Sequence, residues 1–579
     1  MQTAAKIGLV VEGTTVPFWV AEAIRDLLFS GEAEFPLVVQ LSSADPNSDT
    51  QRANICNPAS GFQPVGWNYA AYRGYQNLDA RLKKREPAYD TPVPLKEVLP
   101  DTDVLFIESE ADSSDLQAIE STKLDILFNT CSFLPDEDIT RLASFGVWSY
   151  CNGDGYSVQS EANGFREMTS GAATTGVSLK LTLAGNQPGK VISSSQHLPD
   201  ILLLGRQRHD VLMQASSQLP AAVRRLQRLG WENFLGELSL KELSNRESGT
   251  NIHSQVIRTL PYPGNVQTVW ALLRHGCRYA GLKVRKLLFQ EQWCLLARYL
   301  QPEGDSAAEP AMELADFTEI KPPRDRIWAD PFVVADDVDN NRFHIFIEEM
   351  ELQKGHGHIS VLTIDRQGNH QGAVPIIERP YHMSYPFIFE FQGERFMIPE
   401  TGENLTVQLY RCVEFPHRWE FVQYLMEGRF AVDTTLHEAD GRWWMFTTLR
   451  DNNNTDCLDE LHIFHADSPL STDWQPHPQN PVSRDVTVAR PGGHLFRGNV
   501  EYAGKLMRPS QNGGYHYGWG ISINEVTRLD EEVFEETLLR TLEPGWHRSV
   551  IATHTLNHAN GMTVSDIRKL RFRWKPGTR

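Results

Sequence analysis

The chain has 579 residues, 41% of them hydrophobic, and a mean hydropathy of -0.38. These values describe a globular protein with several domain-sized parts. The formal net charge of -19 argues against nucleic acid as the main partner, because phosphate binding needs a basic surface. No run of about 18 apolar residues exists, so no membrane-spanning helix is expected.

The cysteines and the first residues bear on the compartment. Seven cysteines are scattered along the chain and no pair has C-x-x-C spacing, so we expect reduced thiols rather than disulfides or a zinc site. Residues 1–6 lead directly into a short strand without a long apolar region, so no secretory signal is expected. The combined expectation is a cytoplasmic protein, with a location at the inner face of the membrane as an extension.

Residues 1–204 alternate short apolar strands with helices. The expected strands cover residues 6–11, 103–107 and 124–129, and an amphipathic helix covers residues 20–28. Short apolar strands that alternate with helices favour a mainly parallel sheet covered on both faces. We therefore predict an α/β domain over residues 1–204.

Three stretches of this domain, residues 146–154, 175–179 and 187–192, resemble the formyltransferase family. That family uses an asparagine, a histidine and an aspartate, and the resemblance matches these positions to Ser149, Cys151 and Gln187. Serine is a weaker oxyanion donor than asparagine, and glutamine does not accept a proton. The resemblance thus implies a Rossmann-type fold without formyl transfer. No folate is expected, and a sugar or nucleotide pocket and a purely structural role both stay open.

Residues 205–290 are predicted to be helical and to form a connector. Within them, residues 266–289 combine five Lys and Arg residues with leucines at helical spacing. A basic amphipathic helix can lie on an anionic membrane surface, which predicts peripheral membrane contact. The alternative is a packing helix between domains with a solvated basic face.

Residues 291–579 carry a recurring strand signature. Proline or aspartate cues fall at positions 330, 386, 433 and 491, with spacings of 56, 47 and 58. Strand-rich units that repeat at roughly 40–50 residues are typical of propeller blades. We predict an all-β propeller over residues 291–579. The first strand of each blade would then face the axis, where Asp330 and Asp433 would converge.

The propeller region resembles glycoside hydrolase family 43, a five-bladed fold. The resemblance implies that Asp330, in Ala-Asp-Pro, is the base, that Asp433 is a second acidic residue, and that His554 lies in the last blade. An axial cation such as Ca²⁺ near His554 is also implied. The family's general acid is a glutamate, but the matching position holds Arg490, which does not donate a proton at neutral pH.

Two interpretations follow from this departure. In the first, another carboxylic acid takes over, with Glu400 and Glu349 as candidates, and the protein is a glycosidase. In the second, the leaving group is a phosphate, which needs positive charge rather than an acid. Arg490 and Arg508 could supply that charge, and the protein would be a glycosyltransferase.

The same region is similar to the propeller region of plant glucosamine inositolphosphorylceramide transferases. The shared cues are residues 384–390, 399–401, 409–411, 508–511 and 517–518, which bring Tyr385 and Gln511 into the predicted substrate-binding set with Arg490, Arg508 and His554. The leading prediction is a glycosyltransferase that uses a nucleotide-sugar or lipid-phosphate donor and a carbohydrate acceptor, in polysaccharide or glycolipid assembly. The alternatives are a glycosidase and a non-catalytic sugar-binding protein.

Each of these residues also has a structural interpretation. An aspartate before proline is a common turn starter, which applies to Asp330, and Asp433 could cap a turn. Arg508 could pair with a buried carboxylate. His462 and His465 lie three residues apart in a predicted strand and point to opposite faces, so they do not suggest a metal site.

Overall fold

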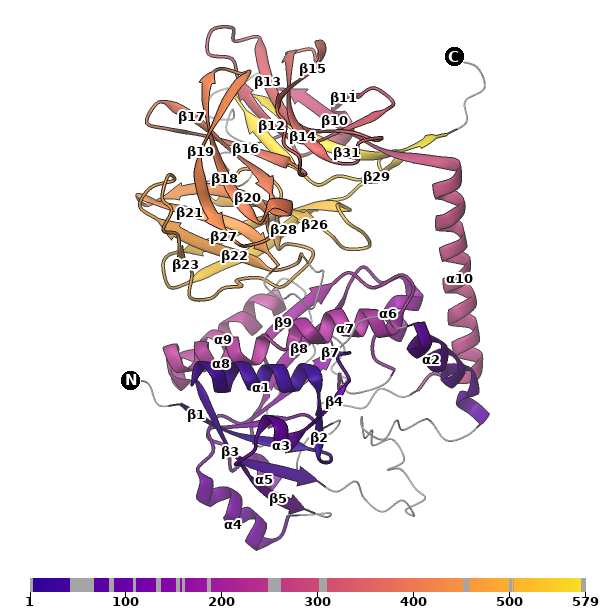
Figure 1. Cartoon of the computed structure of the whole chain (residues 1–579), viewed down its shortest axis with the longest axis vertical. Helices are drawn as coiled ribbons and strands as arrows, with labels where there is room; N and C mark the ends of the chain where they lie inside the picture. Colours follow the sequence, from indigo (N-terminus) through magenta and orange to yellow (C-terminus); the bar gives the residue numbers. More distant parts are fainter. Residues whose placement is uncertain are drawn as a thin grey trace. The chain divides into compact units, whose positions relative to one another are not determined.

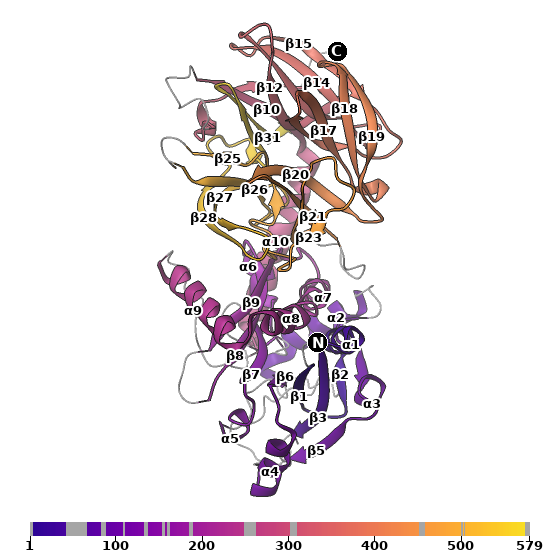
Figure 2. The same ribbon diagram turned by 90° about the vertical axis from the view of Figure 1, so that its left-hand side faces the viewer.

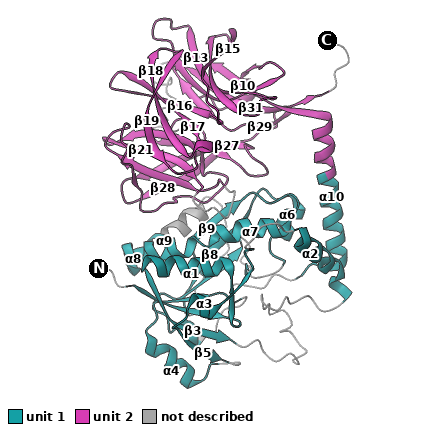
Figure 3. Cartoon of the chain, in the orientation of Figure 1, with its two compact units in different colours: residues 1–279 teal, residues 280–579 magenta. Residues whose placement is uncertain are grey.

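The computed structural model describes residues 4–41, 67–82, 88–107, 111–131, 137–152, 157–158, 162–184, 189–247, 262–300, 310–450, 458–498, 502 and 504–573. The chain divides into two compact units, unit 1 (residues 1–279) and unit 2 (residues 280–579) (Figure 3). The predicted connector over residues 205–290 is therefore not a third compact part, and most of it belongs to unit 1.

Unit 1 is built around one mixed sheet, which has seven strands in the part of the chain that the structure describes (Figure 1). The strands are β1 (Ala5–Val11), β3 (Ala33–Leu41), β5 (Asp103–Ile107), β6 (Ile126–Asn129), β7 (Val147–Asn152), β8 (Thr175–Thr182) and β9 (Lys190–His197). Their order across the sheet is β5-β3-β1-β6-β7-β8-β9. The first five in this order run parallel, and β8 and β9 follow as antiparallel neighbours. This confirms a mixed α/β unit with a mainly parallel sheet.

Helices cover both faces of this sheet. The helices of unit 1 are α1 (Phe18–Ser30), α2 (Ala70–Leu82), α3 (Leu95–Val98), α4 (Ser113–Thr122), α5 (Glu137–Thr140), α6 (Phe165–Ser170), α7 (Leu204–Ala215), α8 (Gln218–Leu229) and α9 (Trp231–Glu247), with a short hairpin of β2 (Thr15–Pro17) and β4 (Pro92–Pro94). One core contains residues of α1, α7, α8 and α9, and a second core contains Ile119 of α4 and Ile139 of α5. Leu219 and Phe234 are fully buried in the first core, so α8 and α9 are part of the domain rather than a linker.

Helix α10 (Asn265–Leu288) crosses the boundary between the units and leads directly into the first strand of unit 2 (Figure 1). Its N-terminal part packs Ala271 and Leu272 against a small aromatic core around Tyr72. None of the helices in the described part of the chain is long and apolar enough to cross a bilayer.

Unit 2 is a five-bladed β-propeller, since its described strands form five separate sheets (Figure 2). Blade one is β12 (Arg326–Ala335), β13 (Arg342–Glu351), β14 (Gly357–Asp365) and β15 (His370–Ile377). Blade two is β16 (Ser384–Phe391), β17 (Glu394–Thr401), β18 (Thr406–Glu414) and β19 (Arg418–Glu427). Blade three is β20 (Ala431–Ala439), β21 (Arg442–Leu449), β22 (Leu461–Ala466) and β23 (Gln475–Pro476). The predicted propeller is thereby confirmed.

The last two blades are less regular. Blade four is β24 (Arg490–Pro491), β25 (Phe496–Arg497), β26 (Leu506–Asn512), β27 (Gly520–Leu529) and β28 (Phe534–Leu542), and blade five is β10 (Phe289–Tyr299), β11 (Thr318–Ile320), β29 (Val550–Ala552), β30 (Leu556–Ala559) and β31 (Met562–Phe572). In blade five, β10 from the start of unit 2 pairs antiparallel with β31 from its end, from Phe289↔Phe572 to Tyr299↔Met562. This pairing closes the ring of blades and leaves no open sheet edge at the seam.

The first strands of the blades surround the propeller axis. β12 contacts β16, β16 contacts β20, β20 contacts β24, and β12 also contacts β30. Residues on these strands are therefore brought together although they lie far apart in the sequence. The candidate site lies here.

Candidate functional site

A β-bulge occurs at the same place in the first strand of blades one, two and three. Residues 330–331, 385–386 and 433–434 each oppose a single residue of the second strand. The first bulge residues are Asp330, Tyr385 and Asp433, and their φ values are 50°, 43° and 55°. This left-handed backbone costs a non-glycine residue about 1–2 kcal/mol. Such strain is typical of functional positions.

The bulges also explain the sequence cues. The second bulge residue makes no ladder hydrogen bond, so proline is tolerated there, and Pro331 and Pro386 occupy it. The equivalent positions are therefore Asp330, Tyr385 and Asp433. The cue at residue 386 marks the second position of its bulge, one residue after the equivalent of Asp330.

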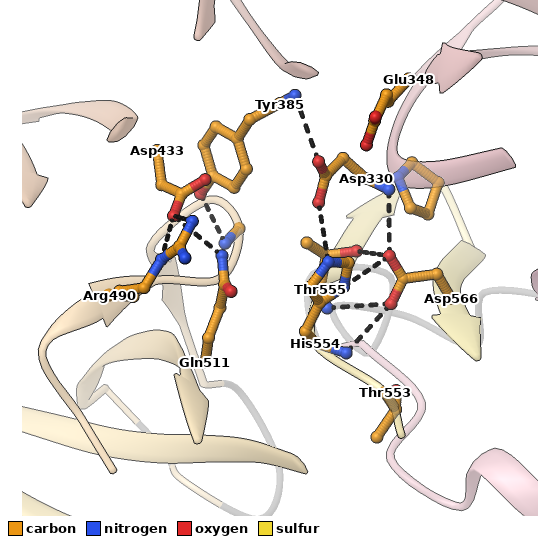
Figure 4. Close-up of polar contacts among 12 residues, drawn as sticks. Asp330, Glu348, Tyr385, Asp433, Arg490, Gln511, Thr553, His554, Thr555 and Asp566 are labelled. Atoms are coloured by element: carbon orange, nitrogen blue, oxygen red, sulfur yellow. Dashed lines mark hydrogen bonds and ion pairs between the residues drawn. The ribbon is translucent and has the colours of Figure 1, made fainter. Parts of the chain in front are cut away.

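Asp330 belongs to a buried cluster with His554 and Asp566 (Figure 4). The backbone N–H of Asp330 donates to Asp566 Oδ2 at 3.0 Å, and His554 Nε2 lies 3.5 Å from Asp330 Oδ1. His554 Nδ1 lies 2.7 Å from Asp566 Oδ2, and the imidazole stacks on Trp293 with ring centroids 4.2 Å apart. The cluster thus fixes both the Asp330 backbone and the ring beside its carboxylate.

The pKa values in this cluster are shifted in different directions. Burial would lower the pKa of His554, but the neighbouring carboxylates, Asp566 first, raise it to about 9. Burial raises the pKa of Asp330 to about 7, against the opposing effect of the His554 cation. The pKa of Asp566 is lowered, because the His554 cation and the hydrogen bonds that Asp566 accepts outweigh its burial. At neutral pH the cluster therefore holds a cationic imidazole beside an aspartate that is close to its own pKa.

A second cluster surrounds Asp433 (Figure 4). Arg490 Nε donates to Asp433 Oδ2 at 2.7 Å, and Gln511 Nε2 donates to the same oxygen at 3.0 Å. The guanidinium of Arg490 also lies over the ring of Tyr517, 5.1 Å from its centroid. Burial opposes the charge of Arg490, but Asp433 first and then other neighbours raise its pKa, so it remains a cation.

Tyr385 connects the two clusters. Its backbone N–H donates to Asp330 Oδ2 at 3.3 Å. Its hydroxyl lies 2.8 Å from Thr435 Oγ1 and accepts a hydrogen bond of 2.8 Å from the N–H of Gly493 in blade four. Burial raises the pKa of this phenol far above its usual value, so Tyr385 stays neutral and positions its neighbours.

Two further glutamates lie beside these clusters at equivalent positions of adjacent blades. Glu348 pairs with Ala329, and Glu400 pairs with Ser384, in each case directly before the bulge. Burial, with a smaller contribution from nearby Asp330, raises the pKa of Glu348 to about 8. Burial also raises the pKa of Glu400 well above its usual range, and Asp433 adds to this. Both groups therefore keep a proton at neutral pH.

Glu349 and Arg508, which the sequence placed in the site, have other partners. Glu349 alternates with Glu348 along β13 and faces Trp328. It accepts hydrogen bonds from Arg326 (2.9 Å), Trp328 (3.1 Å) and Ser360 (2.8 Å). Arg508 is fully buried and forms a bidentate ion pair with Glu536, with both distances at 2.7 Å. The geometry thus shows a structural network for Glu349 and a buried ion pair for Arg508.

The structure brings together Asp330, Tyr385, Glu400, Asp433, Arg490, Gln511 and His554 of the predicted set. Sequence reasoning missed Glu348, Asp566, Tyr517 and Trp293. Glu348 could have been found by aligning the second strands of blades one and two on their bulges, but Asp566 has no cue in the sequence.

Asp330, His554 and Asp566 each offer one possible metal-ligand atom, and these three atoms lie within 4.8 Å of one another. Ca²⁺ prefers six to eight oxygen ligands. Here one of three groups is a cationic imidazole, and Asp566 already accepts hydrogen bonds from the N–H groups of Asp330, His554 and Thr555. These side chains alone do not form a calcium cage, so the axial cation stays a prediction.

In unit 1 two of the three positions matched to formyltransferase residues lie on β7. Ser149 and Cys151 are both buried. Burial raises the pKa of the Cys151 thiol to about 11, which makes it a poor nucleophile. Gln187 lies outside the described residues.

The sequence of unit 2 has identifiable relatives. Residues 303–551 match the model of the family described as "Glucosamine inositolphosphorylceramide transferase 1, N-terminal". The predicted resemblance to these transferases is thereby confirmed. Glucosamine inositolphosphorylceramide transferase 1 of Oryza sativa subsp. japonica is 30% identical over 232 residues, 40% of this chain and 30% of the relative. The Arabidopsis thaliana protein of the same name is 29% identical over 230 residues, 39% of this chain and 29% of the relative.

The chain thus spans about 30% of the length of the curated relatives it matches. Among solved structures, a β-xylosidase matches with a TM-score of 0.29 and 14% identity over 46% of this chain and 96% of its own. A thermostable family-43 glycoside hydrolase matches with a TM-score of 0.28 and 15% identity over 38% of this chain and 77% of its own.

Proposed function

We propose that unit 2 is a glycosyltransferase that moves a sugar from a phosphate-activated donor to a glycan or glycolipid acceptor. The observation that carries this proposal is Asp330, a strained, buried carboxylate whose pKa is raised to about 7 and which adjoins a second cluster with a buried cation. A general base is most effective when its pKa lies near the working pH. Asp330 would therefore take the proton of the acceptor hydroxyl.

Arg490 provides the matching half of the reaction. A phosphate leaves with its own negative charge, so it needs a cation and no proton donor. Asp433 and Gln511 fix the position of the Arg490 side chain from one side, because Asp433 Oδ2 accepts hydrogen bonds from both. Bond formation at the acceptor oxygen and departure of the phosphate would then proceed with one proton transferred to Asp330.

The relatives support this assignment and suggest the substrates. Their name describes transfer onto inositolphosphorylceramide. For this chain we infer a nucleotide sugar or a lipid-phosphate sugar as the donor and a carbohydrate, including a glycolipid, as the acceptor. The matched region lies in the N-terminal part of the relatives, as the family description states, so the role of this propeller needs its own test.

The test combines binding and turnover in the full chain. Nucleotide sugars, free nucleotides and simple glycosides are screened by thermal shift, because a bound ligand raises the apparent stability. The ligand found is then assayed for transfer with the wild type, Asp330→Asn and the control Asp467→Asn, whose carboxylate is an exposed ion-pair partner of Arg442.

The proposal expects Asp330→Asn to lose at least about a hundredfold in turnover while still binding the donor, and Asp467→Asn to remain active. Ligand binding without turnover, unchanged by Asp330→Asn, would instead identify a sugar-binding protein. Stabilisation by glycosides but by no nucleotide would direct the search to lipid-phosphate donors or to hydrolysis.

A glycoside hydrolase is the second candidate, and the shifted pKa values of Glu348 and Glu400 favour it. Both keep a proton at neutral pH, so either could protonate a leaving alcohol while Asp330 activates water. A hydrolase predicts release of free sugar without an acceptor. It also predicts that Glu400→Gln or Glu348→Gln loses activity on alkyl glycosides and keeps it on aryl glycosides with acidic leaving groups.

For unit 1 we infer a formyltransferase-like fold that does not transfer formyl groups. Ser149 and the high-pKa thiol of Cys151 stand at positions that need an amide and a proton acceptor. Incubation of the protein with a formyl-folate donor and amino sugars should give no formylated product. Formation of such a product would refute this inference.

A further inference from the structure

Helix α10 exposes a continuous apolar face. Three of its side chains are among the most exposed large hydrophobic residues of the chain, namely Val266 (83% exposed), Trp270 (69%) and Leu287 (72%). Each residue turns an α-helix by about 100°, so these three positions fall on one side of the helix, in a stripe with six more exposed residues. The full stripe is Val266, Val269, Trp270, Leu273, Cys277, Ala280, Val284, Leu287 and Leu288.

This stripe is separate from the face that packs. Ala271 and Leu272 contact the aromatic core around Tyr72, and Thr268 is buried. These residues lie roughly opposite the exposed stripe around the helix. The stripe extends over 22 residue steps, or about 33 Å at 1.5 Å per residue. Exposed apolar surface of this extent marks a contact site in a stable protein.

The charges on the helix indicate which partner covers the stripe. α10 has no aspartate or glutamate, and it carries Arg274, Arg278, Lys283, Arg285 and Lys286, in a chain whose net charge is -19. Arg274, Arg278 and Arg285 lie beside one edge of the apolar stripe and Lys283 beside the other, whereas Lys286 lies on the opposite face. A long apolar stripe with basic flanks matches the boundary between anionic headgroups and acyl chains. A second copy of the chain fits poorly, because two α10 helices face to face would bring basic residues together.

We propose that α10 binds an anionic lipid surface, lying along the interface with its exposed stripe inserted between the headgroups. The four basic residues beside the stripe attract the headgroups, and the apolar side chains, Trp270 among them, anchor the helix. This contact would hold the protein at a membrane surface. The proposal does not depend on any catalytic residue of unit 2.

The test is sedimentation of the full chain with vesicles of phosphatidylcholine, with and without about one third phosphatidylglycerol. We expect binding to the anionic vesicles that weakens with added salt. Leu273→Gln/Leu287→Gln should weaken binding at least tenfold, because two apolar anchors are lost. The matched control is Leu538→Gln/Leu539→Gln, which makes the same changes at exposed leucines of β28 and should bind like the wild type.

The electrostatic part is tested separately. Arg274→Gln should weaken binding about fivefold, which corresponds to about 1 kcal/mol per basic residue near an anionic surface. Lys286→Gln, on the face opposite the stripe, should weaken binding less. Trp270→Phe removes the fluorescence change that marks insertion of this side chain.

Failure of the wild type to bind anionic vesicles would overturn the proposal, as would equal binding of the wild type and Leu273→Gln/Leu287→Gln. Self-association that this double variant abolishes, without vesicle binding, would assign the stripe to a second copy instead.

Discussion

Glu348 and Glu349 are neighbours on β13, and the same substitution should change stability in opposite directions at the two positions. Glu349 accepts hydrogen bonds from Arg326, Trp328 and Ser360. Although burial raises its pKa, these bonds and one from His358 lower it to about 2, from 4.5 in the unfolded chain. Glu348 has the opposite shift, to about 8, because it is buried beside Asp330.

The contribution of Glu349 to the free energy of unfolding follows from the difference between its pKa values in the folded and unfolded states. A pKa difference of about 2.5 at about 1.4 kcal/mol per pH unit gives about 3 kcal/mol. Because the folded-state pKa is the lower one, this stabilisation is present above pH 4.5 and is lost as the pH falls through 2. Glu349→Gln should therefore lower the free energy of unfolding by about 3 kcal/mol at neutral pH, and its deficit should shrink in acid.

For Glu348 the contribution to stability depends on pH in the opposite direction. Its folded-state pKa is the higher one, so the favourable contribution is complete below pH 4.5 and is lost as the pH rises through 8. At neutral pH the wild type keeps a proton that the unfolded chain would release. Glutamine resembles the protonated acid in shape, so Glu348→Gln should be at least as stable as the wild type at neutral pH and more stable in alkali.

Urea unfolding of the full chain at about pH 9, about pH 7 and about pH 4 measures both effects. The transition that shifts in the two variants is assigned to unit 2, since both substitutions lie there. Equal destabilisation by the two substitutions would refute this reasoning. A Glu349→Gln deficit that stays constant into acid would also refute it, because the ionised form of Glu349 would then not be the stabilising one.

Further predictions concern the base, the buried ion pair and the thiol of unit 1. Turnover by the proposed transferase should rise with pH through about 7, because Asp330 must lose its proton to act as base; a steady-state pH profile flat from about pH 5 to 9 would contradict this. Arg508→Met should cost about 3 kcal/mol with donor affinity unchanged, because it leaves the largely buried carboxylate of Glu536 unpaired. Arg508→Met/Glu536→Leu should regain most of that stability in urea titrations. Tyr385→Phe should cost about 1–2 kcal/mol, because the Gly493 N–H loses its acceptor, and thermal unfolding would measure this. Cys151 should react with a thiol reagent only on unfolding, as its buried thiol has a pKa of about 11.

The sequence predicted the propeller because its repeat has a local physical cause. A bulge needs a first residue that accepts a positive φ and a second one that makes no ladder hydrogen bond, which is why Asp-Pro and Tyr-Pro recur. Blade four departs from this pattern. There β24 has only two residues and Gly492 and Gly493 follow it, so the cue at Pro491 predicted a blade but not its form.

The site was harder to predict, because its members are joined only by tertiary contacts. Asp566 lies on β31, the last strand that the structure describes, which closes the ring by pairing with β10. Its side chain accepts a hydrogen bond from the backbone N–H of Asp330 in blade one. No local pattern in residues 562–572 indicates this. The choice of Glu349 over Glu348 had a different cause, since the register of β12 and β13 decides which of two adjacent side chains faces the axis, and a single sequence does not reveal that register.

The helices of residues 205–247 were assigned to a connector because their amphipathic pattern shows that one face is buried but not what buries it. In the structure Leu219 and Phe234 complete the core over the sheet of unit 1. Helix α10 differs, because two of its faces are apolar and only one packs. An amphipathic sequence pattern alone does not distinguish a helix whose apolar face packs in a core from one whose apolar face is exposed.

The equivalence of the blades links the strain, the charges and the proposed chemistry. Three bulges hold Asp330, Tyr385 and Asp433 in a backbone conformation that costs each of them free energy. Beside two of these bulges, Glu348 and Glu400 occupy equivalent positions and retain protons against their normal tendency. At the third, the equivalent position is Thr448, and Asp433 is neutralised by Arg490 instead. A stable propeller requires none of these features. Natural proteins retain such costs where a function depends on them. The three bulges therefore support chemistry at the axis of this propeller more strongly than Arg490 alone, which stands where the glycoside hydrolase family has a glutamate.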